Sequence, residues 1–214
     1  MPRVTNASSS LPALSDPERA CLALAWEALL AGTMPIGAVV VDATGTIIAS
    51  GRNAVYGTAD PPLISGSALA HAEVNALLWL PTGKEHASYQ LVTSLEPCLL
   101  CTGALRMAGL GAVTYLGADP RHGGLWALTS PMYAARQEVK VAGPRADQVG
   151  LLAAGLTFAY HRRRSATSAF VLACQERRPD IAAAGTALAA AGLFAMAERE
   201  MSWAAAEPVL LAAV

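Results

Sequence analysis

The sequence predicts an α/β fold in which helices pack on the faces of a sheet, followed by an alanine-rich helical tail. Three observations support this prediction. Strand-like and helix-like segments alternate between residues 15 and 117, a hairpin pattern turned by a glycine lies early in that stretch, and alanine dominates the chain beyond residue 145. The length of 214 residues suits one domain with an extension better than two full domains.

The first elements follow from capping and turn chemistry. Residues 15–18 read Ser-Asp-Pro-Glu, a capping box with proline in the first turn, which predicts a helix that ends at about Ala31. Residues 37–42 and 46–52 are β-branched and apolar runs separated by Ala-Thr-Gly. Gly45 therefore supplies the turn of a predicted β-hairpin.

The other elements are assigned from hydrophobic pattern and from turn residues. A long loop rich in proline, glycine and serine covers residues 53–70. After it we expect helices at about 72–80 and 98–108, strands at 89–94 and 112–116, a short strand at 139–142, and two or three helices from 145 to the end, broken near Pro179 and Pro208.

Cys98 and Cys101 form a Cys-x-x-Cys pair, a spacing that lets both thiolates reach one metal ion. Pro97 fits the first position of a helix, and a helix N-terminus stabilises thiolates. Alone, the pair is also compatible with a redox dithiol, half of a structural zinc site or two core cysteines. The chain has no second Cys-x-x-Cys, so a further ligand must come from elsewhere. Cys21 and Cys174 lie in apolar helical segments and are expected to be buried side chains of the core.

His71 is the candidate third ligand. It begins a predicted helix, and Glu73 follows two residues later in an otherwise apolar stretch. Taken singly, His71 could be a structural residue and Glu73 a surface acid in a first helical turn. Their order before Pro-Cys-x-x-Cys, with a strand between, matches the His-x-Glu and Pro-Cys-x-x-Cys signature of zinc deaminases. Three protein ligands leave the fourth tetrahedral position open, as in catalytic zinc sites.

The segment from about residue 15 to 124 resembles the cytidine and deoxycytidylate deaminase superfamily, and within it the branch of tRNA adenosine deaminases and bacterial guanine deaminases. The resemblance implies a three-layer α/β/α sandwich with a mixed central sheet. It implies a deaminase domain at residues 15–130. The serine-rich start predicts a mobile leader at 1–14, and the alanine-rich pattern predicts a mainly helical extension at 131–214 packed on the domain. Besides the metal signature it rests on Pro-Ile-Gly-Ala-Val at 35–39, Gly-Arg-Asn at 51–53, Leu-Glu-Pro at 95–97, Cys-Thr-Gly-Ala-Leu at 101–105, and the strand at 112–117.

The resemblance also implies the roles of the metal residues. His71, Cys98 and Cys101 would hold one Zn²⁺ per chain. Zinc lowers the pKa of bound water towards about 7, which makes a nucleophile available at neutral pH. Glu73 would carry protons from the water to the ring and to the departing ammonia.

Three further contacts are implied at the substrate. Asn53 would hydrogen-bond the substrate, although alone it could equally be a turn residue that ends the hairpin. The backbone of Ala72 would contact the ring, and the backbone N–H of Cys98 would stabilise the tetrahedral intermediate. Aromatic residues that could cover the pocket are Trp126, Tyr133 and Phe158.

Charge and composition bear on partners and location. A net charge of −1 argues against nucleic acid as a partner, and the cluster Arg162-Arg163-Arg164 suits the end of a helix, where it faces the negative pole of the dipole. The chain shows no signal peptide and no membrane span, so we expect a cytoplasmic location. Charged residues make up 14% of the chain, which leaves less polar surface than a monomer normally has. A homodimer that covers apolar surface and a genome bias towards alanine would both explain this, and the homodimer is slightly favoured.

Three functional hypotheses remain. The first is hydrolytic deamination of a free nucleobase, nucleoside or related small heterocycle, favoured by the neutral charge and the extra helices. The second is a tRNA adenosine (A-to-I) deaminase, favoured by the likeness but not by the charge. The third is a non-catalytic zinc-binding scaffold, which the intact Glu73 disfavours. The loop before His71 departs from the branch's compact Asp-Pro-Thr-Ala pattern, so the substrate stays undecided.

Overall fold

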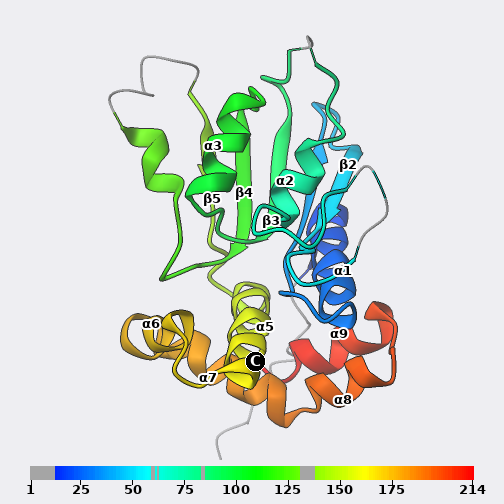
Figure 1. The fold of residues 1–214 in the computed structure, drawn as a ribbon, viewed down its shortest axis with the longest axis vertical. Helices are drawn as coiled ribbons and strands as arrows, with labels where there is room; N and C mark the ends of the chain where they lie inside the picture. The colour runs from blue at the N-terminus through cyan, green and yellow to red at the C-terminus, as the bar shows by residue number, and fades with distance from the viewer. Residues whose placement is uncertain (1–12, 59–60, 62, 83–84, 131–137) are drawn as a thin grey trace, which may run out of the picture.

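The computed structural model describes residues 13–58, 61, 63–82, 85–130 and 138–214, so most of the predicted mobile leader lies outside the described residues. At its centre is a mixed five-stranded sheet in the order β2-β1-β3-β4-β5 (Figure 1). β1 pairs antiparallel with β2 and β3, whereas β3, β4 and β5 run parallel. The predicted mixed sheet is confirmed. Its strands are β1 (Gly37–Val41), β2 (Ile47–Arg52), β3 (Gln90–Leu95), β4 (Ala112–Gly117) and β5 (Lys140–Ala142).

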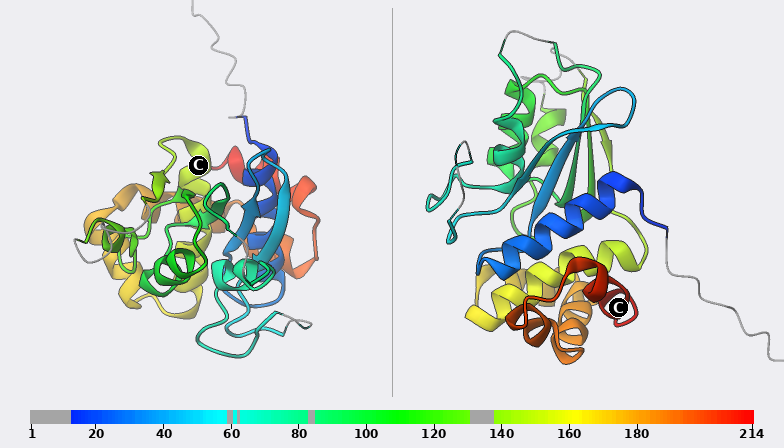
Figure 2. Two further views of the ribbon diagram at one scale, coloured as in Figure 1. Left: turned by 90° about the horizontal axis from the view of Figure 1, so that it is seen from above. Right: turned by 90° about the vertical axis from the view of Figure 1, so that its right-hand side faces the viewer.

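Helices cover both faces of the sheet. On one face, α1 (Asp16–Leu30) and α5 (Gln148–Arg164) share a core in which Trp26 and Leu152 pack with Leu116 of β4. On the other face, α2 (Ala72–Leu77) and α3 (Leu99–Met107) enclose Val40, Leu91 and Leu105. The three-layer α/β/α arrangement is therefore confirmed. In Figure 2, α7, α8 and α9 lie beyond α1 and α5 as seen from the sheet.

Glycine allows α2 to lie directly on β2. A Cβ atom on Gly51 would sit 2.3 Å from the backbone N of Ala76 and 2.4 Å from the carbonyl O of Ala72, distances that real Cβ atoms do not adopt. The close contact holds the start of α2 next to the end of β2. It therefore brings His71 and Glu73 near Asn53, which follows β2.

The C-terminal region contains more helices than the sequence predicts. Instead of two or three, the described residues form α5, α6 (Ala169–Arg177), α7 (Pro179–Ala190), α8 (Leu193–Glu198) and α9 (Trp203–Leu211), after a short 3₁₀ helix η1 (Leu125–Thr129). The helical conformation is interrupted at Ser165 and at Gly192, which has a φ of 91°. The alanine-rich sequence does not mark these two interruptions. Pro179 begins α7 as expected, but Pro208 lies inside α9, where it removes only one backbone donor.

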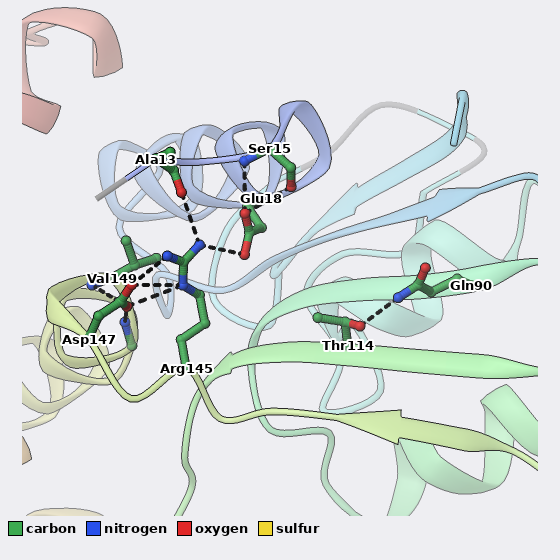
Figure 3. Close-up of polar contacts among 9 residues, drawn as sticks. Ala13, Ser15, Glu18, Gln90, Thr114, Arg145, Asp147 and Val149 are labelled. Atoms are coloured by element: carbon green, nitrogen blue, oxygen red, sulfur yellow. Dashed lines mark hydrogen bonds and ion pairs between the residues drawn. The ribbon is translucent and has the colours of Figure 1, made fainter. Parts of the chain in front are cut away.

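A polar cluster joins the beginnings of α1 and α5 (Figure 3). Arg145 Nη1 donates to Glu18 Oε1 at 2.8 Å and to the carbonyl of Ala13 at 3.2 Å. The same guanidinium donates through Nε and Nη2 to Asp147. Asp147 in turn accepts from the backbone N–H groups of Val149 and Gly150, which makes it the N-cap of α5. The cluster ties the start of α5 to the start of α1.

Among the described residues, none of the helices combines the length and the hydropathy that crossing a bilayer requires.

Candidate metal centre and active site

His71, Cys98 and Cys101 meet at one end of the sheet. His71 Nδ1 lies 3.4 Å from each of the two sulfur atoms, and the sulfurs are 3.6 Å apart. Two ligands at the usual zinc distances on a tetrahedral centre would be separated by roughly 3.5 to 3.8 Å. The three donor atoms thus have the type and spacing of a zinc site with a fourth position open. The three predicted ligands are brought together, with Nδ1 as the donor atom of the imidazole.

Local structure explains how the ligands converge. His71 is the N-cap of α2, Cys98 is the N-cap of α3, and Cys101 lies in the first turn of α3. Pro97 precedes the cap and does not occupy the first helical position, contrary to the sequence prediction. Capping by Cys98 leaves its thiol at the helix N-terminus, where the helix dipole favours negative charge.

The thiol of Cys98 is prepared to act as a thiolate. A hydrogen bond from Cys101 and another with His71 lower the pKa of Cys98 to about 4, although partial burial opposes the shift. Thiolate is the form in which cysteine binds metal. The donor set alone therefore favours a cation at this point.

Glu73 lies beside the ligands without belonging to the triad. Its side chain is 4% exposed, and Oε2 accepts from Cys101 Sγ at 3.3 Å. Burial, together with the negative charge of Cys98, raises the pKa of Glu73 to about 7. A buried carboxyl group that titrates near neutral pH can both accept and release a proton, which is what general acid–base catalysis requires.

Asn53 presents an unused donor to the same site. Its Oδ1 accepts from Thr33 Oγ1 at 2.6 Å and from the backbone N–H of Val55 at 3.1 Å. Its Nδ2 is buried and has no hydrogen-bond partner among the described residues. Because Oδ1 is held in place, Nδ2 stays unpaired within the described residues, at a side chain that lines the cavity.

The long loop in front of His71 is anchored by a residue that sequence reasoning missed. Asn75 of α2 accepts from the backbone N–H of Ile64 at 2.9 Å. Its amide group donates to the carbonyls of Ile64 and Arg52, both at 3.1 Å. The side chain therefore joins the loop to the end of β2. In the sequence, the signal for this role of Asn75 is its place on the same predicted helix as Glu73.

A cavity of about 350 Å³ opens in front of the ligands, a size typical of small-molecule sites. The predicted residues Asn53, His71, Glu73 and Cys98 line it, and Ala72 is fully buried beside them. The contacts expected of Ala72 and of the Cys98 N–H stay predictions. The cavity is also lined by residues to which the sequence-based predictions assign no role in the site, namely Met34, Ile36, Leu95, Glu96, Asp119, His122, Thr157, His161 and Phe170.

Of the aromatic residues that could cover the pocket, Phe158 and Trp126 do not do so. Phe158 is 1% exposed and packs in a core cluster with Leu95 and Phe170, because its position on α5 faces the helices behind the cavity. Trp126 is 67% exposed on η1 and does not line the cavity. Tyr133 lies outside the described residues. Phe170 and His161, which the sequence-based predictions do not single out, line the cavity.

The arginine cluster at the end of α5 is engaged by the protein itself. Arg162 donates to Thr186 at 2.6 Å, and Arg163 pairs with Glu198 at 2.9 Å. The guanidinium carbon of Arg164 lies 4.6 Å from the ring centre of Tyr56. These contacts support the expected structural role of the cluster.

The other two cysteines are buried, as expected. Both Cys21 and Cys174 have no exposed surface, and Cys21 Sγ donates to the carbonyl of Val92 at 2.9 Å. Burial raises the pKa of both thiols, to about 12 for Cys174.

The chain is similar to several known proteins. Residues 15–117 match the sequence profile of the cytidine and deoxycytidylate deaminase zinc-binding region. The guanine deaminase of Bacillus subtilis is 42% identical over 98 residues, which cover 43% of this chain and 56% of that protein. The tRNA-specific adenosine deaminase of Haemophilus influenzae is 33% identical over 112 residues, which cover 50% of this chain and 60% of that protein.

The tRNA(Ile)-lysidine synthase of Deinococcus radiodurans is 36% identical over 126 residues, which cover 56% of this chain and 20% of that protein. The chain therefore spans a fifth to three fifths of the length of these three curated relatives. Among solved structures, the guanine deaminase of Nitrosomonas europaea is 24% identical with a TM-score of 0.50, covering 71% of this chain and 88% of that chain. This likeness shows a shared fold.

Proposed function

Since residues 15–117 belong to the cytidine and deoxycytidylate deaminase family, we propose that the chain is a zinc-dependent hydrolytic deaminase of small rings. Its substrate would be an amino-substituted nucleobase, nucleoside or related heterocycle. The observation that carries the proposal is the triad of His71, Cys98 and Cys101 with the buried carboxyl of Glu73 beside it, at a cavity that His71, Glu73 and Cys98 line.

The reaction replaces a ring amino group by a carbonyl oxygen taken from water. His71, Cys98 and Cys101 would hold one Zn²⁺, which when bound supplies the Lewis acid that makes water nucleophilic at neutral pH. Glu73 accepts a proton from the attacking water and passes it to the ring nitrogen next to the attacked carbon. It then carries the second proton to the amino group, the C–N bond breaks and ammonia leaves. Asn53 Nδ2 would hold the ring by donating a hydrogen bond.

A tRNA adenosine deaminase is the second candidate. The 33% identity to such an enzyme favours it. The net charge of −1 and the protein contacts of the arginine cluster favour a small substrate, because RNA binding depends on cations that are free to meet phosphates. Salt-dependent binding of an anticodon stem-loop together with inosine formation would identify the RNA enzyme. The third candidate, a scaffold with structural zinc, leaves the buried acid of Glu73 without a use.

The sequence-based expectations of a homodimer and of a cytoplasmic location are kept as proposals. Large apolar side chains are exposed on α3 and η1, including Leu99, Leu100, Met107 and Trp126. α3 and η1 lie against each other and share a shallow groove. A second copy of the chain would cover this apolar face, because monomers rarely expose large apolar patches.

The decisive experiment is an ammonia-release screen of the purified protein over guanine, adenine, cytosine, their nucleosides and triazine-like rings. We expect turnover of at least one ring, and Glu73→Gln should lower kcat by at least about 100-fold while zinc is retained. Glu27→Gln, an exposed acid of α1, is the matched control and should behave as wild type. Ammonia release by the Glu73→Gln protein at the wild-type rate contradicts the assigned proton role.

A further inference from the structure

One wall of the cavity comes from helices beyond residues 15–117, the segment that carries the family resemblance. Thr157 and His161 of α5 and Phe170 of α6 line it. Thr157 and His161 are four residues apart, so their side chains lie on the same face of α5, one turn from each other. The metal ligands come from α2 and α3. A ring held at the metal would therefore have these C-terminal side chains at its other edge.

The hydroxyl of Thr157 is a buried polar group, at a residue of the cavity wall, that the described part of the chain leaves unpaired. Thr157 is 1% exposed, and its Oγ1 has no hydrogen-bond partner among the described residues. A helical threonine commonly bonds the carbonyl four residues earlier, and that bond is absent among the hydrogen bonds of the described chain. Buried hydroxyl groups are nearly always satisfied. Asn53 Nδ2 is a second unsatisfied group on the same cavity, and it comes from the end of β2.

Next to Thr157 the wall is aromatic. The rings of His161 and Phe170 are 5.0 Å apart at 28°, and those of His122 and Phe170 are 6.3 Å apart at 4°. Asp119 holds His122 in this row, because its Oδ1 accepts from the backbone N–H of His122 at 2.7 Å and its Oδ2 lies 3.6 Å from Nδ1. Such a row suits a planar ring more than a flexible chain.

The charges of the cavity set a further condition. Its charged lining consists of Glu73, Glu96 and Asp119 together with histidines, and among the described residues no lysine or arginine lines it. A phosphate group would face carboxylates without a lysine or arginine to pair with. The cavity therefore suits an uncharged ring.

We propose that Thr157 is a specificity-determining residue, whose hydroxyl hydrogen-bonds a flat, uncharged substrate ring that carries no phosphate. This inference rests on the proposed deaminase function and adds the substrate class. Asn53 Nδ2 can only donate, whereas a hydroxyl both donates and accepts. The ring accordingly carries an acceptor towards Asn53 and a polar group of either kind towards Thr157.

The test compares Thr157→Val, which keeps the side-chain shape, with Thr157→Ser, which keeps the hydroxyl. Thr186→Val is the matched control, because Thr186 is an exposed threonine of the neighbouring α7. For the ring that the wild type turns over best, kcat/KM should fall by about three- to ten-fold in Thr157→Val. It should stay near wild type in the other two proteins. The melting temperature of Thr157→Val should be unchanged or higher, since an unsatisfied buried hydroxyl is removed.

The outcomes separate this inference from the proposed function. Absence of wild-type turnover on every ring contradicts the proposed function. Wild-type turnover with equal kcat/KM in Thr157→Val and Thr157→Ser overturns the role of Thr157 alone. A lower melting temperature in Thr157→Val also overturns it, because the hydroxyl would then be structural. A nucleoside 5′-monophosphate that is turned over faster than its nucleoside overturns the uncharged substrate class.

Discussion

At the scale of single residues, the four cysteines show how environment decides the role of one side chain. Cys98 ends a loop at a helix N-terminus beside His71 and Cys101, and these neighbours lower its pKa. Cys174 lies inside α6 without exposed surface, and burial raises its pKa. The same thiol is therefore a candidate metal ligand in one place and part of the core in the other.

This contrast gives a prediction for metal content. The wild-type protein should contain about one zinc per chain by elemental analysis, whereas Cys98→Ala should lose it, with an affinity lower by more than about 100-fold. Cys174→Ala is the control, because it removes the same group as Cys98→Ala. It should keep the metal, although it leaves a small cavity in the core. Full zinc occupancy in Cys98→Ala would refute the ligand set.

The residues of the site were predictable to different degrees. His71, Cys98 and Cys101 follow from spacing, because metal ligands must come from residue types with few substitutes, and Glu73 follows from its place two residues after His71. Thr157 and Phe170 could not be found in the same way. A threonine or a phenylalanine occurs on many helices, and only the packing of α5 and α6 against the site gives them a function.

At the scale of elements, the start of α5 depends on the Arg145 cluster. Hydrogen bonds from Ser15 and Arg145 lower the pKa of Glu18 from its ordinary 4.5, although burial opposes them. Burial alone would raise the pKa of Asp147, but hydrogen bonds from Arg145 and from the backbone N–H groups of α5 lower it from the ordinary 3.8. Both carboxyl groups thus stabilise the fold when ionised.

Replacing Arg145 by Ala should therefore cost about 1 to 2 kcal/mol of unfolding free energy at pH 7, a range reduced for the partial exposure of Asp147. Lowered pKa values mean that this contribution is present above the ordinary values near 4 and is lost as pH falls through the folded ones. Urea unfolding at pH 7 and pH 3 should show the difference between the two proteins shrinking in acid. An equal difference at both pH values contradicts the electrostatic explanation.

Element types were more predictable than element ends. The hairpin and the helices beside the metal follow from turns, caps and hydrophobic pattern, and they occur within a few residues of the expected places. The C-terminal helices were merged because alanine favours helix everywhere and marks no end. Their ends depend on Ser165 and Gly192, and Ser168 begins α6 by accepting from the backbone N–H of Val171.

At the scale of the whole molecule, the site draws on segments from most of the chain. The sheet and its helices α2 and α3 position the candidate metal ligands, whereas α5 and α6 complete the cavity. Hydrophobic periodicity could predict each helix by itself. It could not predict that the tail folds back to the carboxyl ends of β3 and β4, because that depends on long-range contacts such as those of Arg145 with Glu18.

The apolar face on α3 and η1 leads to a prediction for assembly. Met107 ends α3 and is 83% exposed in the single chain. If a second copy covers this face, Met107→Glu places a charge in an apolar interface and should raise the dimer dissociation constant by about 30-fold or more. Val209→Glu introduces the same charge at a half-exposed apolar position of α9 and is the control.

Light scattering coupled to size-exclusion chromatography measures the result. We expect the wild type and Val209→Glu to elute as dimers and Met107→Glu as a monomer that still binds zinc, because Met107 lies two turns beyond the ligand Cys101. A wild-type monomer contradicts the homodimer. Dimers in all three proteins would place the interface on another face, and the exposed side chains of α3 would then need a different partner.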